Sequence, residues 1–178
     1  MFGTIQRKKT KGENYIMQSR TLVINALVAA LYFVVTAVVA PFGFLGIQFR
    51  ISELFNHLIV LNKKYFFGIV VGVFLANLVF SPTKADIVFG VLHTALSLGI
   101  TMYIARFVKN KIALMWINTA VFSINMYIIA YMLIFFADVP DAFGVLWLSL
   151  GISEFVTMGV AIYIMYFLNK RLNLEKLI

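Results

Sequence analysis

Long apolar runs, separated by short polar segments, dominate the chain. A membrane-spanning helix needs roughly 20 predominantly apolar residues, and six runs reach or approach that length. They cover residues 21–40, 47–62, 65–81, 86–107, 112–137 and 144–168. Only helices and closed barrels satisfy their backbone polar groups in lipid, and these runs lack the two-residue alternation of barrel strands. The pattern therefore predicts an all-α membrane protein with six transmembrane helices in one bundle.

The second run is short and polar for a membrane span. Its first part, "IQFRISELFNH", holds the densest polar cluster among the apolar runs. Lys63 and Lys64 follow it and divide it from the third run, because lysines in hydrocarbon are costly. An alternative interpretation has five spans, with residues 47–62 as a re-entrant or extracellular segment.

The six runs leave room for one domain only. Residues 1–20 form a basic N-terminal segment, residues 21–169 the six-helix membrane domain, and residues 170–178 a short tail. The N-terminal segment does not resemble a secretory signal, because the apolar stretch after it continues for about twenty residues without a small-residue cleavage site. Met17 offers a second start, so part of the basic segment can be an upstream extension.

Composition and charge agree with a membrane protein. Hydrophobic residues make up 62% of the 178 residues and charged residues 12%, against roughly 45–50% apolar content in soluble domains. All Lys and Arg residues except Arg50 and Lys84 fall at one end of the predicted bundle. The positive-inside rule then places both termini in the cytoplasm (N-in/C-in). Topology thus explains the net charge of +8, and a nucleic-acid partner is not needed.

Polar and charged residues inside the predicted spans gather in the outer half of the membrane. Their depths follow from a rise of ~1.5 Å per helical residue. The inner half is almost wholly apolar, so the asymmetry predicts a pocket that opens outward rather than a pore. The positions in chain order are Arg50, Glu53, His57, Asn77, Asp86, His93, Asn125 and Glu154.

Several of these residues also have a purely structural interpretation. Arg50 and Glu53 are three residues apart on one helical face and can neutralise each other. Asp86 can cap a helix N-terminus, where its charge interacts favourably with the helix dipole. His93 is as readily a buried packing residue as a ligand contact.

Glu154 carries the strongest functional signal. Its run contains no other charge, and a carboxylate at the centre of a span costs ~2.5–3.5 kcal/mol on insertion scales. A pair with Arg50 is one explanation, and a ligand contact is the favoured one. Asn118 and Asn125 share a helical face, and interhelical hydrogen bonding explains either without function.

Motifs of catalysis and metal binding are absent from the sequence. There is no Walker loop, so the chain cannot itself use ATP, and there is no nucleophile elbow and no HExxH. No cysteine is present, and no spacing of His and carboxylates supports a metal site. We therefore predict no catalytic residue, no metal and no cofactor. A separate signal is Ala26 and Ala30, four residues apart, because small side chains at that spacing let another helix approach closely.

Four blocks of the sequence resemble the QueT family. They are "NALVAALYFVVTAVVAPFGFLGIQFRISE", "GVFLANLVFSPTKADIVFGVLHT", "SINMYIIAY" and "LSLGISEFVTMGVA". The similarity extends over roughly residues 22–168. That family comprises queuosine-precursor substrate-binding subunits, or S-components, of energy-coupling factor (ECF) transporters, which are ABC-type importers of the bacterial cell membrane.

The resemblance implies a division of labour. An S-component binds its cargo outside and reorients in the membrane when partner proteins use ATP. The implied partners are a transmembrane coupling protein, contacted through the Ala26 and Ala30 motif, and two ATPase subunits.

The resemblance also implies a 7-deazaguanine cargo such as preQ1 or preQ0. A carboxylate can accept both donors of its base edge, amides or Arg can donate to its carbonyl, and an aromatic face can stack on the ring. The cationic aminomethyl group of preQ1 would be stabilised by a second carboxylate. We therefore expect Glu154 to bind the base edge and Glu53 or Asp86 to bind the amine. The candidate substrate-binding residues are Glu154, Glu53, Arg50, Gln48, Asn125, Asp86, Asn77, His93, Phe89 and Tyr127, with Phe49 as a further stacking surface.

Three functions compete at this point. The leading one is the ECF substrate-binding subunit, for a queuosine precursor or for another vitamin-like solute. A membrane enzyme acting on lipids would need a cluster of metal-binding carboxylates on the cytoplasmic side, whereas the carboxylates here lie outward. An assembly protein without a ligand would leave the intramembrane Glu154 unexplained.

Overall fold

Helices make up most of the ranges that the structure describes. The computed structural model describes residues 11–43, 51–81 and 83–178, and no strand occurs in them. The all-α prediction is therefore confirmed. In chain order the elements are α1 (Lys11–Gly43), η1 (Ile51–His57), α2 (Leu58–Leu61), η2 (Lys63–Tyr65), α3 (Phe66–Phe80), α4 (Ala85–Ile104), α5 (Lys111–Asn125), α6 (Tyr127–Phe136), α7 (Phe143–Leu172) and η3 (Leu174–Lys176).

Five described helical segments are long and apolar enough to cross a membrane. They are Gln18–Val39, Lys63–Phe80, Ala85–Ile104, Lys111–Phe136 and Phe143–Leu172. The remaining predicted run is represented by Ile51–Leu61, which is apolar but shorter. Seven of its residues form 3₁₀ turns, so its length is about 20 Å at ~2.0 Å per 3₁₀ residue and ~1.5 Å per α residue. That is less than the ~30 Å hydrocarbon core of a bilayer.

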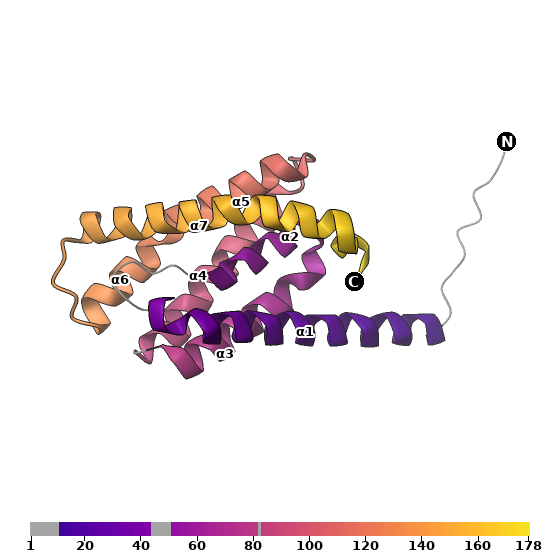
Figure 1. Cartoon of the computed structure of the whole chain (residues 1–178), viewed down its shortest axis with the longest axis horizontal. Helices are drawn as coiled ribbons and strands as arrows, with labels where there is room; N and C mark the ends of the chain where they lie inside the picture. The colour runs from indigo at the N-terminus through magenta and orange to yellow at the C-terminus, as the bar shows by residue number, and fades with distance from the viewer. Residues whose placement is uncertain (1–10, 44–50, 82) are drawn as a thin grey trace.

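The short segment of η1 and α2 lies in the middle of the bundle. Helices α1, α3, α4, α5 and α7 contact one another in that order around it. The segment itself contacts α1 and α7 through η1, and α4 and α5 through α2. Figure 1 shows α2 between α7 and α1. Ile51 is 47% exposed and Leu54 and Phe55 are half-buried, whereas the polar residues of the segment are buried. The polar side chains therefore face the interior of the bundle.

The chain between α1 and α3 crosses the bundle. Gly68 lies against Asn25, and Gly72 lies against Ala29 and Tyr32, so α1 and α3 run in the same direction. The intervening chain must then return from one end of the bundle to the other, and Ile51–Leu61 covers part of that path. This return is what the prediction of a second helix requires, although the helix is shorter than a standard span.

Glycines bring α1 and α3 close together. A Cβ atom at Gly72 would lie 2.7 Å from the Cβ of Tyr32 and 3.2 Å from the Cα of Ala29. The backbone N–H of Gly68 donates to the side-chain oxygen of Asn25 at 2.7 Å. Two small residues four apart thus form the α3 side of a close helix–helix contact, as in other membrane helices.

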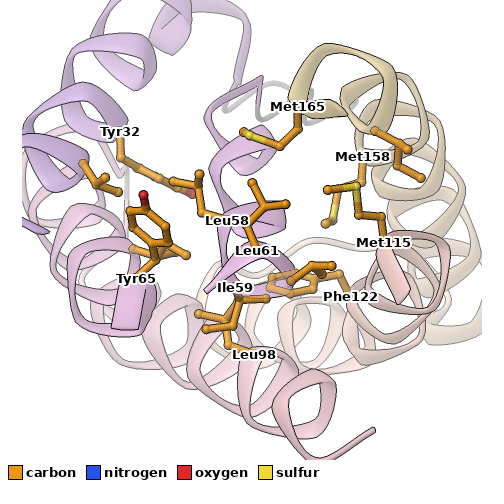
Figure 2. Packing of buried hydrophobic residues seen from close by; sticks show 14 of the residues in the cluster. Tyr32, Leu58, Ile59, Leu61, Tyr65, Leu98, Met115, Phe122, Met158 and Met165 are labelled. Atoms are coloured by element: carbon orange, nitrogen blue, oxygen red, sulfur yellow. The ribbon is translucent and has the colours of Figure 1, made fainter. Parts of the chain in front are cut away.

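The apolar core is rich in methionine and fills the space around the central segment. Figure 2 shows Leu58, Ile59 and Leu61 of that segment among the side chains of the surrounding helices. Their buried neighbours include Met115, Phe122, Met158 and Met165 from α5 and α7, Leu98 from α4, and Tyr32 and Tyr65. Unbranched, polarisable Met side chains suit such irregular gaps.

The start of α1 and the C-terminal residues lie at the same end of the bundle (Figure 1). The C-terminal residues close this end: the hydroxyl of Tyr65 donates to the carbonyl of Leu174 at 2.7 Å. The amide of Asn62 donates to the carbonyls of Glu175 and Ile178, both at 3.2 Å. We refer to this end as the basic end. It carries exposed basic side chains, namely Lys63, Lys64, Arg106 and Lys109, beside the residues that follow α7.

Candidate functional site

The polar face of the candidate site begins with η1. Ser52, Glu53, Asn56 and His57 are all at most 2% exposed, although they include most of the polar atoms in "ISELFNH". The spacing i, i+1, i+4 and i+5 places these four residues on one side of a helix. That side meets α1, α5 and α7.

Hydrogen bonds within the bundle position the first part of η1. The hydroxyl of Thr36 on α1 donates to the hydroxyl oxygen of Ser52 at 2.8 Å. The side-chain amide of Asn56 donates to one carboxylate oxygen of Glu53 at 3.3 Å, while the side-chain oxygen of Asn56 has no hydrogen-bond partner among the described residues. The Glu53 carboxylate is thus held beside the side-chain amide of Asn56, whose oxygen atom can still accept a hydrogen bond.

A second network lies one turn further along and fixes His57. Its Nε2 is 3.0 Å from the carbonyl oxygen of Met158 on α7, and its Nδ1 is 3.4 Å from the side-chain nitrogen of Asn118 on α5. A carbonyl only accepts, so Nε2 carries the proton and Nδ1 accepts from the amide. Asn118 also donates to the carbonyl of Asn56 at 3.3 Å and accepts from the hydroxyl of Thr101 at 2.7 Å. Both groups of the Asn118 amide are therefore used inside the protein, as its interpretation as an interhelical hydrogen-bonding residue requires.

Glu154 lies on the face of α7 that meets η1. It is 1% exposed, and Met158, four residues later, occupies the same helical face. His57 contacts Met158 of α7, and Asn62, five residues later, contacts Glu175 and Ile178, which follow α7. Because later residues of one segment contact later residues of the other, η1 and α7 run in the same direction. Glu154 precedes Met158 by one turn, just as Glu53 precedes His57. Two buried carboxylates from different elements therefore lie at the same level of the bundle.

Asp86 and Asn77 form a local structure at the turn between α3 and α4. The Asp86 carboxylate accepts a hydrogen bond from the hydroxyl of Ser81, and the amide of Asn77 donates to the backbone carbonyl of Asp86 at 3.1 Å. Asp86 lies in the first turn of α4, two residues after the N-cap residue Lys84. An acidic residue there interacts favourably with the helix dipole, so these contacts agree with the structural interpretation of Asp86.

His93 and Asn125 lie where α4 packs on α5. The Nε2 atom of His93 is 3.1 Å from the carbonyl oxygen of Phe122. The His93 and Phe122 rings pack edge to face, with 5.4 Å between their centroids. The amide of Asn125 donates to the hydroxyl of Ser97 at 2.9 Å. Both residues are buried and join the two helices.

The remaining candidates fall in three groups. Phe89 packs in an aromatic cluster with Tyr131 and Phe136. Tyr127 is 42% exposed, so the structure does not place it among the buried polar side chains. Gln48, Phe49 and Arg50 lie outside the described residues, and so the predicted pairs of Arg50 stay predictions.

Sequence reasoning missed several residues of the central networks. Asn56 belongs to the polar cluster of the second run, but nothing in its spacing separates it from Glu53. Single hydroxyls such as those of Thr36, Ser97 and Thr101 give no signal, because Ser and Thr are common in membrane helices. Ser52 and Asn56 could have been found from their spacing, because both share one helical side with Glu53 and His57.

A bundle with five described apolar segments of membrane-spanning length defines a multi-pass membrane protein. The family model described as QueT transporter matches residues 22–170, and the chain belongs to this family. It is a transporter rather than an enzyme.

A relative with an assigned role is the protein named Queuosine precursor transporter QueT from Lactococcus lactis subsp. cremoris (strain MG1363). It is 34% identical to the chain over 165 residues, which cover 87% of this chain and 95% of the relative. No solved structure matches the chain.

Proposed function

We propose that the chain is the substrate-binding membrane subunit of an ECF-type importer, and that it captures a queuosine precursor of the 7-deazaguanine class, preQ1 or preQ0. Membership of the QueT transporter family and the name of the Lactococcus relative support the cargo. The observation that carries the site is the pair of buried carboxylates, Glu53 and Glu154, at one level in the centre of the bundle.

The chemistry of a deazaguanine suits this pair. The ring N–H and the exocyclic NH₂ are neighbouring donors, and one ionised carboxylate accepts both. We assign this role to Glu154. The aminomethyl cation of preQ1 then goes to Glu53, because Asp86 already accepts the Ser81 hydroxyl in the turn between α3 and α4. The free acceptor of Asn56 adds a further contact for an N–H donor of the cargo.

The neighbouring networks support the pair without taking part in binding. Asn118 and His57 are hydrogen-bonded to each other, and His57 is also hydrogen-bonded to the backbone of α7. These contacts fix the position of the turn that follows Glu53. Gln48, Arg50 and Asn125 remain the proposed partners for the carbonyl of the base. Phe49, Phe89 and Tyr127 remain the proposed stacking residues, with His93 and Asn77 at the margin of the site.

The outer face of α1 supports the proposed partner. Ala26 and Ala30 are exposed, whereas Ala29 between them is buried against Gly72. Ala29 thus packs inside the bundle, whereas the row formed by Ala26 and Ala30, here called the open row, is left open for another helix. We assign the open row to a transmembrane coupling protein, which transmits ATP use by two ATPase subunits. With the basic end cytoplasmic, the chain is a multi-pass protein of the bacterial cell membrane with both termini inside.

Titration calorimetry on the purified chain in neutral detergent tests the cargo. We expect saturable binding of preQ1 with a stoichiometry near one, and no binding of adenine, because adenine lacks the adjacent N–H and NH₂ donors of the guanine edge. Equal binding of both bases would contradict recognition through a carboxylate. Absence of preQ1 and preQ0 binding by folded protein would reject the proposed cargo.

A further inference from the structure

A cavity lies at the basic end, between the central segment and the last turns of α4. Its volume is about 650 Å³. One part of the cavity lining is apolar and includes Ile59, Leu61, Met102 and Gly99. Lys63, Tyr103 and Arg106 line its mouth together with Asn62. The cavity therefore joins a charged mouth to an apolar interior.

The two cations at the mouth are available for an anion. Lys63 and Arg106 are exposed, and among the described residues no carboxylate lies within ion-pair distance of either, in contrast to Lys111, which pairs with Glu175. The guanidinium of Arg106 lies over the ring of Tyr103, 5.6 Å from its centroid. Stacking uses the face of the guanidinium and leaves its N–H donors, which lie in the plane, free for the oxygens of a phosphate.

The dimensions of the cavity match the membrane interface. Arg106 lies two residues beyond the end of α4 and seven residues from Gly99, which is about 10 Å at ~1.5 Å per residue. A cation and an exposed aromatic ring at the mouth are typical of the headgroup level. The apolar wall then extends into the hydrocarbon. A free anion would use only the mouth, whereas a lipid would use the whole cavity.

We propose that this cavity binds one anionic phospholipid of the leaflet at the basic end. Its phosphate lies between Lys63 and Arg106, and the upper part of one acyl chain lies along Ile59 and Met102. Basic pockets between membrane helices recognise anionic headgroups in this way. This inference does not depend on the identity of the transported solute.

Native mass spectrometry of the full chain, titrated with phosphatidylglycerol or phosphatidylcholine in neutral detergent, measures the binding. We expect one tightly held phosphatidylglycerol and weaker phosphatidylcholine. The double variant Lys63→Gln/Arg106→Gln should bind phosphatidylglycerol about tenfold or more weakly. The matched control Lys109→Gln/Lys170→Gln removes the same charge from exposed residues at the same end, outside the cavity lining, and should change binding less than about twofold.

A variant that keeps every charge separates the cavity from its mouth. A Cβ atom at Gly99 would meet nothing within 4 Å, and the same holds at Gly144 outside the cavity. Gly99→Leu should therefore fold, fill the space of the acyl chain and lower phosphatidylglycerol binding, whereas Gly144→Leu should not.

Three outcomes would overturn the proposal. Equal losses in the two charge variants would mean diffuse attraction to the basic end. Displacement of the lipid by millimolar glycerol 3-phosphate would mean a free-anion site. A Gly99→Leu variant that binds lipid normally but loses co-purifying protein subunits would mean a protein interface.

Discussion

Individual polar residues in this bundle divide into those that the protein satisfies and those that keep capacity for a ligand. Asn118 uses both amide groups on three partners, and Asp86 is engaged by Ser81. Asn56 keeps a buried acceptor beside Glu53. A buried amide oxygen without a partner is costly, which is reasonable where a ligand supplies the donor.

Loss of the Asn118 amide should destabilise the protein. In Asn118→Leu the hydroxyl of Thr101 and Nδ1 of His57 lose their partners, and we expect a cost of about 1–2 kcal/mol, given the modest worth of hydrogen bonds inside membrane proteins. Thermal unfolding in detergent measures it. Adding Thr101→Val should recover part of the loss, because both partners of one bond are then apolar. Unchanged stability of the single variant would contradict the network.

At the scale of elements, the sequence predicted the long helices well and the central segment only in part. Apolar length alone indicates where helices occur, because lipid imposes it. In the second run the apolar residues Ile51, Leu54, Phe55 and Leu58 follow the spacing of a helical face, yet the polar residues between them are the ones buried on η1. The reason is tertiary: the polar side of η1 meets other helices of the bundle, which no local pattern reveals. For the same reason, depth estimated from the sequence grouped Asp86 with Glu154.

The close contact of α3 with α1 and the open row on α1 have different expected roles, and substitutions can separate them. Gly72→Leu forces a side chain against Tyr32 and Ala29 and should destabilise the fold by about 1–3 kcal/mol. Ala30→Leu lies on the open row and should leave thermal stability and preQ1 binding nearly unchanged.

The coupling role of the open row is measured by co-purification of ATPase subunits and the coupling protein with tagged chain from native membranes. We expect Ala30→Leu to reduce the recovered partners strongly. Val38→Leu is the matched control, because Val38 is also exposed on α1, at 74%. Full recovery of partners with Ala30→Leu would place the coupling surface elsewhere.

For the whole molecule, the arrangement of charge makes a direct prediction about topology. The parallel contact of α1 with α3 puts Lys64 at the basic end, so Lys64 and Lys109 should share one side of the membrane, and Asp141 should lie on the other. The chain has no cysteine, so single cysteines can be introduced without a background. An impermeant maleimide should label Asp141→Cys in intact cells, but Lys64→Cys and Lys109→Cys only after permeabilisation. Labelling of Lys64→Cys in intact cells would mean that the second run does not return across the membrane.

The central claim is that a buried carboxylate pair in the middle of this bundle holds a 7-deazaguanine, and preQ1 binding by Glu154→Gln tests it most directly. Loss of a charge-assisted hydrogen bond costs about 1.5–3 kcal/mol, so affinity should fall roughly ten- to hundredfold. Glu175→Gln is the matched control, because Glu175 is a surface residue paired with Lys111, and it should bind preQ1 like the unchanged protein. Unchanged affinity in folded Glu154→Gln would contradict the account.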